Sequence, residues 1–188
     1  MLFRSEENAR GHLVITAPTG GSAGVMPAVL YGLVNGKKQV PADKIREGLL
    51  AGLAIGYLCK HNATLAAAEG GCQSEIGVAS AMAAAMFAQV LDSSPQVIEN
   101  AAESALEHHL GMTCDPVAGY VQVPCIERCA FGAVKAWTAC MIATNEIASR
   151  HRVDLDTTIK TLADTGKDMS AKYKETSEAG LAQNLTLC

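Results

Sequence analysis

Aromatic residues are scarce in this sequence, where Phe, Trp and Tyr together make up 4% of 188 residues. Alanine and glycine are abundant instead. Small side chains allow helices to pack at close range, whereas β-rich cores favour branched and aromatic residues. The composition therefore predicts an all-α fold. The length, without any Ser/Gly-rich linker, predicts a single helical domain over residues 1–188.

An excess of positive charge is also lacking. The 15 Lys and Arg residues are outnumbered by 19 Asp and Glu residues, which gives a formal net charge of -4. Proteins that bind nucleic acids or anionic membranes carry a basic stripe or patch. The charge therefore argues against a nucleic acid or a membrane surface as partner and leaves small polar partners open.

No hydrophobic run is long enough to span a bilayer. The longest one, Ile76 to Leu91, is shorter than the ~20 residues that a spanning helix needs, and we interpret it as a buried core helix. At the N-terminus, Glu6 and Glu7 stand where a signal peptide would have its apolar region. These features predict a cytoplasmic protein.

Apolar spacing and capping residues outline the other helices. Pro18, Gly20, Gly21 and Gly24 form a loop that enters a helix. Asp43 can cap the next helix, in which Ile45, Leu49, Leu53 and Tyr57 recur at steps of four on one face. Ser94 followed by Pro95 is typical of a helix start. The expected helices run from about Lys44 to Lys60, Pro95 to Leu110, Ile126 to Arg150, and from Asp154 or Asp156 to Met169.

Seven cysteines are the most unusual feature of the composition. In a reducing compartment they are better interpreted as thiols or metal ligands than as a disulfide framework. Cys59 and Cys140 fall inside helical patterns and read as small hydrophobic residues. Cys129 follows Cys125 by one helical turn, and its position is compatible with either a core residue or a residue of a functional site.

The remaining cysteines, Cys72, Cys114, Cys125 and Cys188, lie at loops or helix edges. Their spacing is not the short CxxC pair of zinc knuckles and ferredoxins. Spacing alone therefore leaves a metal site, a disulfide and a tight loop with small buried side chains as alternatives.

Four segments together closely resemble the α part of the iron-sulfur L-serine dehydratases. They read "TAPTGGSAGVMPAVL", "EGGCQSEIGVASAMAAA", "HHLGMTCDPVAGYVQVPCIER" and "KYKETSEAGLAQN". The resemblance runs in order from about Thr16 to the tail. It implies a helical α part in which Cys72, Cys114 and Cys125 hold a 4Fe-4S cluster.

The resemblance also implies a lyase that converts L-serine to pyruvate and ammonia without pyridoxal phosphate. A cluster with three protein ligands leaves one iron open to act as a Lewis acid on the substrate hydroxyl, while a base removes the α-proton. Hydroxide is a poor leaving group without such help. Cys188 is either a displaceable fourth ligand, as in some members of that family, or part of a frayed end.

The resemblance implies that the Gly-rich turn before residue 25 contacts the substrate. Its hydroxyls and backbone N-H groups at a helix start suit a carboxylate, although such a turn alone is weak evidence. The predicted substrate-binding residues are Thr19, Gly20, Gly21 and Ser22. The adjacent His108 and His109 also match the family, and we expect one of them to be exposed.

The match to that family has gaps. The family usually has Asn where this chain has Gly20 and Cys129, which bears on activity and substrate choice. It also has a β domain or β subunit thought to supply the base, and an upstream α segment, and neither is found here. We therefore expect the catalytic base outside this chain, a β domain or β subunit as partner, and a homo- or hetero-oligomer.

Two other functions remain open at this level. One is desulfidation of L-cysteine by the same chemistry, in which the open iron accepts sulfide instead of hydroxide. The other is a non-enzymatic metal module, with iron-sulfur or zinc bound by cysteines for structure or sensing.

Overall fold

The computed structural model describes residues 2–36 and 39–185. Regular structure in this part of the chain is helical, without a strand, which confirms the all-α prediction. None of the described helices has the length and apolar character needed to cross a membrane. The helices are α1 (Leu2–Ala9), α2 (Val25–Val34), α3 (Ala42–Asn62), α4 (Ala67–Gly70), α5 (Val78–Val90), α6 (Pro95–Glu107), α7 (Cys125–Asn145), α8 (Leu155–Asp168) and α9 (Leu181–Asn184).

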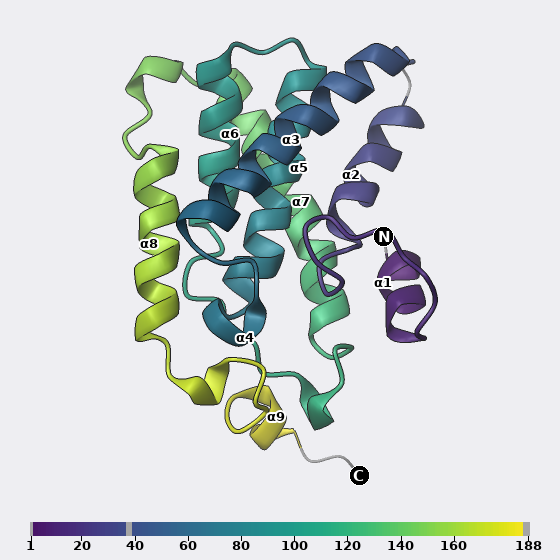
Figure 1. Ribbon diagram of the computed structural model, residues 1–188. Helices are drawn as coiled ribbons and strands as arrows, with labels where there is room; N and C mark the ends of the chain where they lie inside the picture. The colour runs from purple at the N-terminus through teal and green to yellow at the C-terminus, as the bar shows by residue number, and fades with distance from the viewer. Residues whose placement is uncertain (1, 37–38, 186–188) are drawn as a thin grey trace.

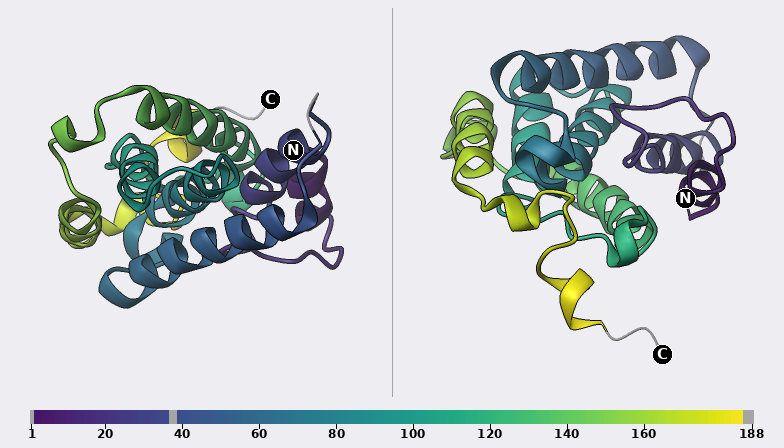
Figure 2. Two further views of the ribbon diagram at one scale, coloured as in Figure 1. Left: turned by 90° about the horizontal axis from the view of Figure 1, so that it is seen from above. Right: turned by 60° about the horizontal axis from the view of Figure 1, so that its bottom comes forward.

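Helix α5 lies at the centre of the molecule, packed by α2, α3, α6 and α7 (Figures 1 and 2). All of its residues except Gln89 are buried, as expected for a helix without a polar face. Its one buried hydroxyl, Ser80 Oγ, donates a hydrogen bond of 2.7 Å to the Gly132 carbonyl of α7. The core-helix prediction for Ile76 to Leu91 is confirmed. The α-helix itself begins at Val78, because a π-helical turn precedes it.

Helix α3 packs on α5 through glycine. Gly48, Gly52 and Gly56 share one face, and a Cβ on Gly48 or Gly52 would come within 2.9 Å of the carbonyl oxygen of Met86 or Met82. Real Cβ atoms essentially never approach backbone so closely. The two helix backbones are therefore in direct contact along this face.

The apolar face of α3 turns outward. Leu49, Leu53 and Tyr57, which define its four-residue pattern, are 40%, 60% and 66% exposed. Pro41 is the N-cap residue, and Asp43 lies within the first turn instead of capping it. The helix prediction is thus confirmed, but its cap is wrong, because the helix starts one residue before Asp43.

Two other helix starts predicted from capping residues agree with the structure. Ser94 Oγ accepts a hydrogen bond from Val97 N at 3.4 Å, and Asp154 Oδ1 accepts one from Thr157 N at 2.7 Å. Helix ends were harder to predict. Helix α6 ends at Glu107 and α7 at Asn145, three and five residues before the expected ends.

A buried polar network explains the early end of α7. Glu146 leaves the helix in an extended conformation and its carboxylate pairs with His151 Nδ1 at 2.9 Å. His151 Nε2 pairs with the fully buried Glu103 of α6 at 2.8 Å, and Thr158 of α8 donates to Glu103 at 2.7 Å. Burial opposes the charge of His151, but the two carboxylates outweigh it and raise its pKa. The network fixes α8 against α6.

The close contact between α3 and α5 predicts that a larger residue at the contact lowers the free energy of unfolding. In Gly52→Ala, the new Cβ has no room beside the Met82 carbonyl, so the helices must separate. We expect a loss of about 1–3 kcal/mol in the free energy of unfolding, measured by chemical denaturation followed by circular dichroism. Gly32→Ala in α2 is the matched control, because its Cβ would meet only Trp137 at 3.4 Å. Equal stability of the two variants would contradict the backbone contact.

Candidate functional site

Three cysteines from separate segments meet at one end of the bundle. Cys72 caps the π turn (Gln73–Gly77), Cys114 lies in the loop after α6, and Cys125 is the first residue of α7. Each thiol interacts with the other two, and none is more than 4% exposed. All three are free thiols. Cys188, the fourth predicted ligand, lies outside the described residues.

Close packing at Gly71 brings Cys72 to the Cys114 loop. Gly71 has φ of 77°, and a Cβ there would lie 2.7 Å from the Met112 carbonyl oxygen, so two constraints favour glycine. The fully buried Gln73 fixes the same contact. Its backbone N-H donates to Met112 O at 3.1 Å, and its Oε1 accepts from Gly111 N at 2.9 Å.

The segment after α8 holds the Cys114 loop from the other side. Cys114 N donates to Tyr173 O at 2.7 Å, and Glu175 N donates to Cys114 O at 2.7 Å. Ser177 Oγ donates to Pro116 O at 2.6 Å. Figure 1 shows this segment and α9 running below the bundle, at the end where α4 lies. The described tail is therefore part of the site's framework.

Arg128 is the cation of the cysteine cluster. Its guanidinium donates to the Thr113 carbonyl and pairs with Asp115 Oδ1 at 3.1 Å. The other oxygen of Asp115 accepts from Leu181 N at 2.7 Å. Arg128 also interacts with the Cys72 sulfur. One residue thus links α7, the Cys114 loop, the tail and the thiols.

The thiols differ in acidity. Hydrogen bonds from Cys114 and Cys125, helped by Arg128, lower the pKa of Cys72 to about 3 against the effect of burial. Hydrogen bonding to Cys125 and Cys72 raises the pKa of Cys114. For Cys125, the hydrogen bond with Cys114 lowers the pKa, but the one with Cys72 and burial outweigh it and raise the value to about 12. Of the three thiols, Cys72 is therefore the one whose surroundings favour the thiolate form.

The other cysteines lie apart from this cluster. Cys59 and Cys140 are fully buried inside α3 and α7, and burial raises the pKa of each to about 12. Cys129 is also buried, but its Sγ donates to the Gly21 carbonyl at 3.0 Å. It therefore touches the predicted substrate loop instead of only filling the core.

The predicted substrate loop folds against the π turn. Thr19 Oγ1 donates to Glu75 Oε1 at 2.6 Å, and the Thr19 and Ser22 hydroxyls are 2.9 Å apart. Gly21 lies so close to Glu75 that a Cβ would be 2.6 Å from Oε2. Gly20 accepts a hydrogen bond at 3.0 Å from Asn8 of α1. The four predicted residues thus form one loop with Glu75 beneath it.

Glu75 is the site residue that the sequence reasoning missed. It lies three residues after Cys72, in the π turn, a form of helix that often occurs at functional sites. Burial, together with the negative charges of Cys72 and Glu175, raises its pKa to about 7 although the Thr19 hydrogen bond opposes this. Its position three residues after a candidate ligand was a weak signal that did not by itself indicate a role.

The two adjacent histidines have different surroundings. His108 is exposed, which confirms that expectation, whereas His109 is 1% exposed. The Nδ1 atom of His109 lies 2.6 Å from the Ala105 carbonyl, and within the described residues its Nε2 has no hydrogen-bond partner. Burial lowers the pKa of His109 to about 4, so its ring is neutral at pH 7.

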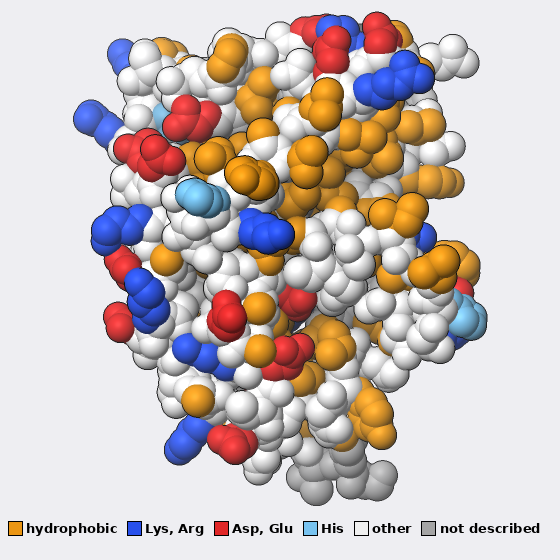
Figure 3. Space-filling view, viewed as in Figure 1, with side chains coloured by type: hydrophobic (Ala, Val, Ile, Leu, Met, Phe, Trp, Pro, Cys, Tyr) orange, Lys and Arg blue, Asp and Glu red, His pale blue; other side chains and the backbone are white. Residues whose placement is uncertain are grey.

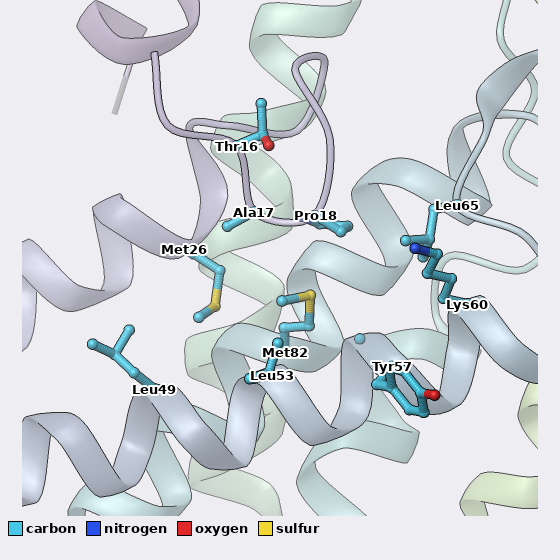
Figure 4. Close-up of a pocket in the computed structure, with 11 residues that line it drawn as sticks. Thr16, Ala17, Pro18, Met26, Leu49, Leu53, Tyr57, Lys60, Leu65 and Met82 are labelled. Atoms are coloured by element: carbon cyan, nitrogen blue, oxygen red, sulfur yellow. The ribbon is translucent and has the colours of Figure 1, made fainter.

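A groove of about 410 Å³ lies between α3 and the loop, but it is separate from the cysteines. The outward face of α3, including Leu53 and Tyr57, forms one wall, and Pro18 and Met82 lie opposite (Figure 4). Figure 3 shows exposed apolar side chains gathered over α3 and α2. Lys60 is the charged residue of the lining. A small zwitterion such as an amino acid suits the polar loop beside Glu75 better than this apolar groove.

This chain is similar to proteins of a known family. The model of the serine dehydratase alpha chain matches residues 2–182. The chain belongs to this family. L-serine dehydratase of Streptomyces coelicolor is 53% identical over 184 residues, or 98% of this chain. L-serine dehydratase 2 of Escherichia coli is 52% identical over 184 residues, and L-serine dehydratase of Helicobacter pylori strain J99 is 50% identical over 182.

The chain spans only part of these relatives. Each of the three matches covers 40% of the relative's length. The matched part contains the Gly-rich loop, the π turn and the cysteine segments, because it extends over nearly all of this chain. The region that matches the serine dehydratase alpha chain thus contains every described residue of the candidate site.

The role of Arg128 in holding the Cys114 loop and the tail can be tested by substitution. In Arg128→Met, Asp115 loses its cationic partner inside the protein, and breaking such a buried pair costs about 3 kcal/mol. We expect faster hydrogen exchange at residues 112–124 and 171–184, measured by mass spectrometry, because both segments depend on Asp115. The exposed Arg152→Met is the control. Unchanged exchange in Arg128→Met would show that the loop holds its position without the guanidinium.

Proposed function

We propose that this chain is the cluster-binding part of an L-serine ammonia-lyase that forms pyruvate and ammonia. The observation that carries the proposal is the meeting of three free thiols from separate segments, next to a loop with hydroxyls and backbone N-H groups. The names of the relatives support the substrate. The assignment of Cys72, Cys114 and Cys125 as ligands rests on this convergence together with the family resemblance.

The residues present fit an iron-sulfur cluster. Thiolates are the usual ligands of such clusters, and Cys72 already favours the thiolate form. Two buried polar atoms, Ser74 Oγ and His109 Nε2, have no hydrogen-bond partner among the described residues. Ser74 follows Cys72 by two residues, and the charge of Cys72 acts on His109. No group of three His, Cys, Asp or Glu side chains in the same part of the chain is arranged to hold a single metal ion. Cluster ligands surround a cube of atoms rather than one ion, so their arrangement differs from that of a mononuclear site.

In this proposal, different residues of the chain bind the substrate and hold the site in position. The backbone N-H groups of Gly20, Gly21 and Ser22 are proposed to bind the substrate carboxylate, because the Thr19 and Ser22 hydroxyls already bond Glu75 and each other. A bound cluster would supply a Lewis acid that helps the substrate hydroxyl to leave. Glu75 holds Thr19 in place, and Arg128 holds the Cys114 loop. Pyridoxal phosphate has no role in this proposal.

The base that removes the α-proton belongs, in this proposal, to a β domain or β subunit. Support comes from the length of the relatives, of which this chain spans about two fifths. We therefore propose a complete enzyme with the β part as partner, in a homo- or hetero-oligomer.

L-Cysteine desulfidation is the second candidate. Its support is the contact between Cys129 and Gly21, because one of the two positions that depart from the family pattern touches the substrate loop. Pyruvate release from L-serine and L-cysteine, compared in the presence of the β part, separates the two activities.

Reconstitution tests the ligand assignment. After anaerobic treatment with iron and sulfide, we expect about four irons per chain and visible absorption typical of a 4Fe-4S cluster. Cys72→Ala, Cys114→Ala and Cys125→Ala should each lose most of the iron and acid-labile sulfide, because each removes one ligand. Cys140→Ala, a buried cysteine on the same helix as Cys125, is the control and should keep both.

Two outcomes would contradict the assignment. Wild-type protein that takes up no iron, with all four variants equally stable, would indicate a fold without cluster chemistry. Protein that retains zinc, with no iron or acid-labile sulfide, would instead support a structural or sensing metal module.

A further inference from the structure

We propose that Glu75 binds the α-ammonium group of the substrate through Oε2 and makes the site selective for amino acids over hydroxy acids. This inference rests on the proposed function, since it concerns the substrate of the same site. It adds a specificity-determining residue that the sequence did not indicate.

The geometry of Glu75 supports this role. Its Oε1 accepts a hydrogen bond of 2.6 Å from Thr19 Oγ1, which fixes the carboxylate against the loop. Its Oε2 would be 2.6 Å from a Cβ placed on Gly21 and accepts no hydrogen bond within the described residues. One oxygen is therefore occupied by the framework, and the other faces the loop that we propose binds the carboxylate of the same substrate.

Nearby charges leave this carboxylate without a cation. Among the described residues, Glu75 forms no ion pair, whereas Asp115 is occupied by Arg128 and Leu181. Glu175 adds a further negative charge that acts on Glu75 and does not neutralise it. The ammonium group of an amino acid is the substrate group that would neutralise a half-buried carboxylate at this position.

The acidity of Glu75 agrees with an unoccupied cation position. Burial and neighbouring negative charges raise its pKa to about 7, which is the behaviour of a carboxylate that lacks a positive partner. A bound ammonium group within about 4 Å favours the charged form and reverses this effect. The loop and Glu75 together then match both charged ends of a zwitterion.

The test compares two ligands that differ at one group. L-Glycerate has a hydroxyl where L-serine has its ammonium group and is otherwise the same. Calorimetric titration of the reconstituted protein should show that Glu75→Gln weakens L-serine binding about 10- to 100-fold, the usual effect of losing a charged hydrogen bond. L-Glycerate binding should stay the same or become tighter, because glutamine does not repel an anion.

Two further variants separate binding from framework effects. Glu47→Gln removes an exposed carboxylate on α3 whose charge does not act on Glu75, and should change neither ligand's affinity. Thr19→Val removes the hydrogen bond to Glu75 but keeps its charge, and should preserve the ratio of serine to glycerate affinity. Circular dichroism checks that each variant is folded.

The possible failures are distinguishable. If wild-type protein binds L-serine and Glu75→Gln binds it equally well, the inference is wrong while the proposed function stands. If Glu75→Gln loses turnover in the complete enzyme with unchanged serine affinity, Glu75 transfers a proton instead, which also overturns the inference. If wild-type protein forms a cluster but binds no L-serine, the proposed substrate and this inference are both wrong.

Discussion

Burial of α5 on every side is the constraint on which the rest of the structure depends. A helix without a polar face must be covered completely, and its small side chains allow four helices to approach it closely. Glycines on α3 bring that helix into backbone contact, which turns the larger apolar side chains of α3 outward. The α3–α5 contact is therefore made by backbone and small residues, and the larger apolar side chains Leu49, Leu53 and Tyr57 are left outside.

The candidate site occurs where α5 loses regular α-helical geometry. The π turn at Gln73–Gly77 directs Gln73 toward the Cys114 loop and Glu75 toward the substrate loop. Cys72, immediately before this turn, meets cysteines from two other segments. A regular helix buried on all sides has no polar positions to offer. The irregular turn thus lets a fully covered helix carry functional side chains at one end.

The sequence predicted the elements better than their contacts. Helix class, the Ser94 start, and the helical positions of Cys59 and Cys140 follow from local patterns that the structure confirms, and of the two predicted starts of α8 the structure has Asp154. Glycine packing of α3 could not be predicted, because a four-residue apolar repeat indicates a face but not its environment. The early end of α7 depends on Glu146 reaching His151, a contact formed only in the folded chain. Glu75 was missed for a similar reason, since neither a π turn nor its contact with Thr19 has a local signal.

Charge connects the two parts of the site. Arg128 is the one cation that interacts with the Cys72 thiolate among the described residues, and it is already paired with Asp115. Burial and the charge of Cys72 raise the pKa of both Glu75 and Glu175, and the charge of Glu175 adds to the effect on Glu75. Such a region is stabilised by positive charge, which iron would supply at the thiols and an ammonium group would supply at Glu75. Because the charge of Cys72 acts on Glu75, neutralising either group lowers the electrostatic cost of ionising the other. Binding of the cofactor and of an amino acid would therefore favour the same ionisation state of the protein.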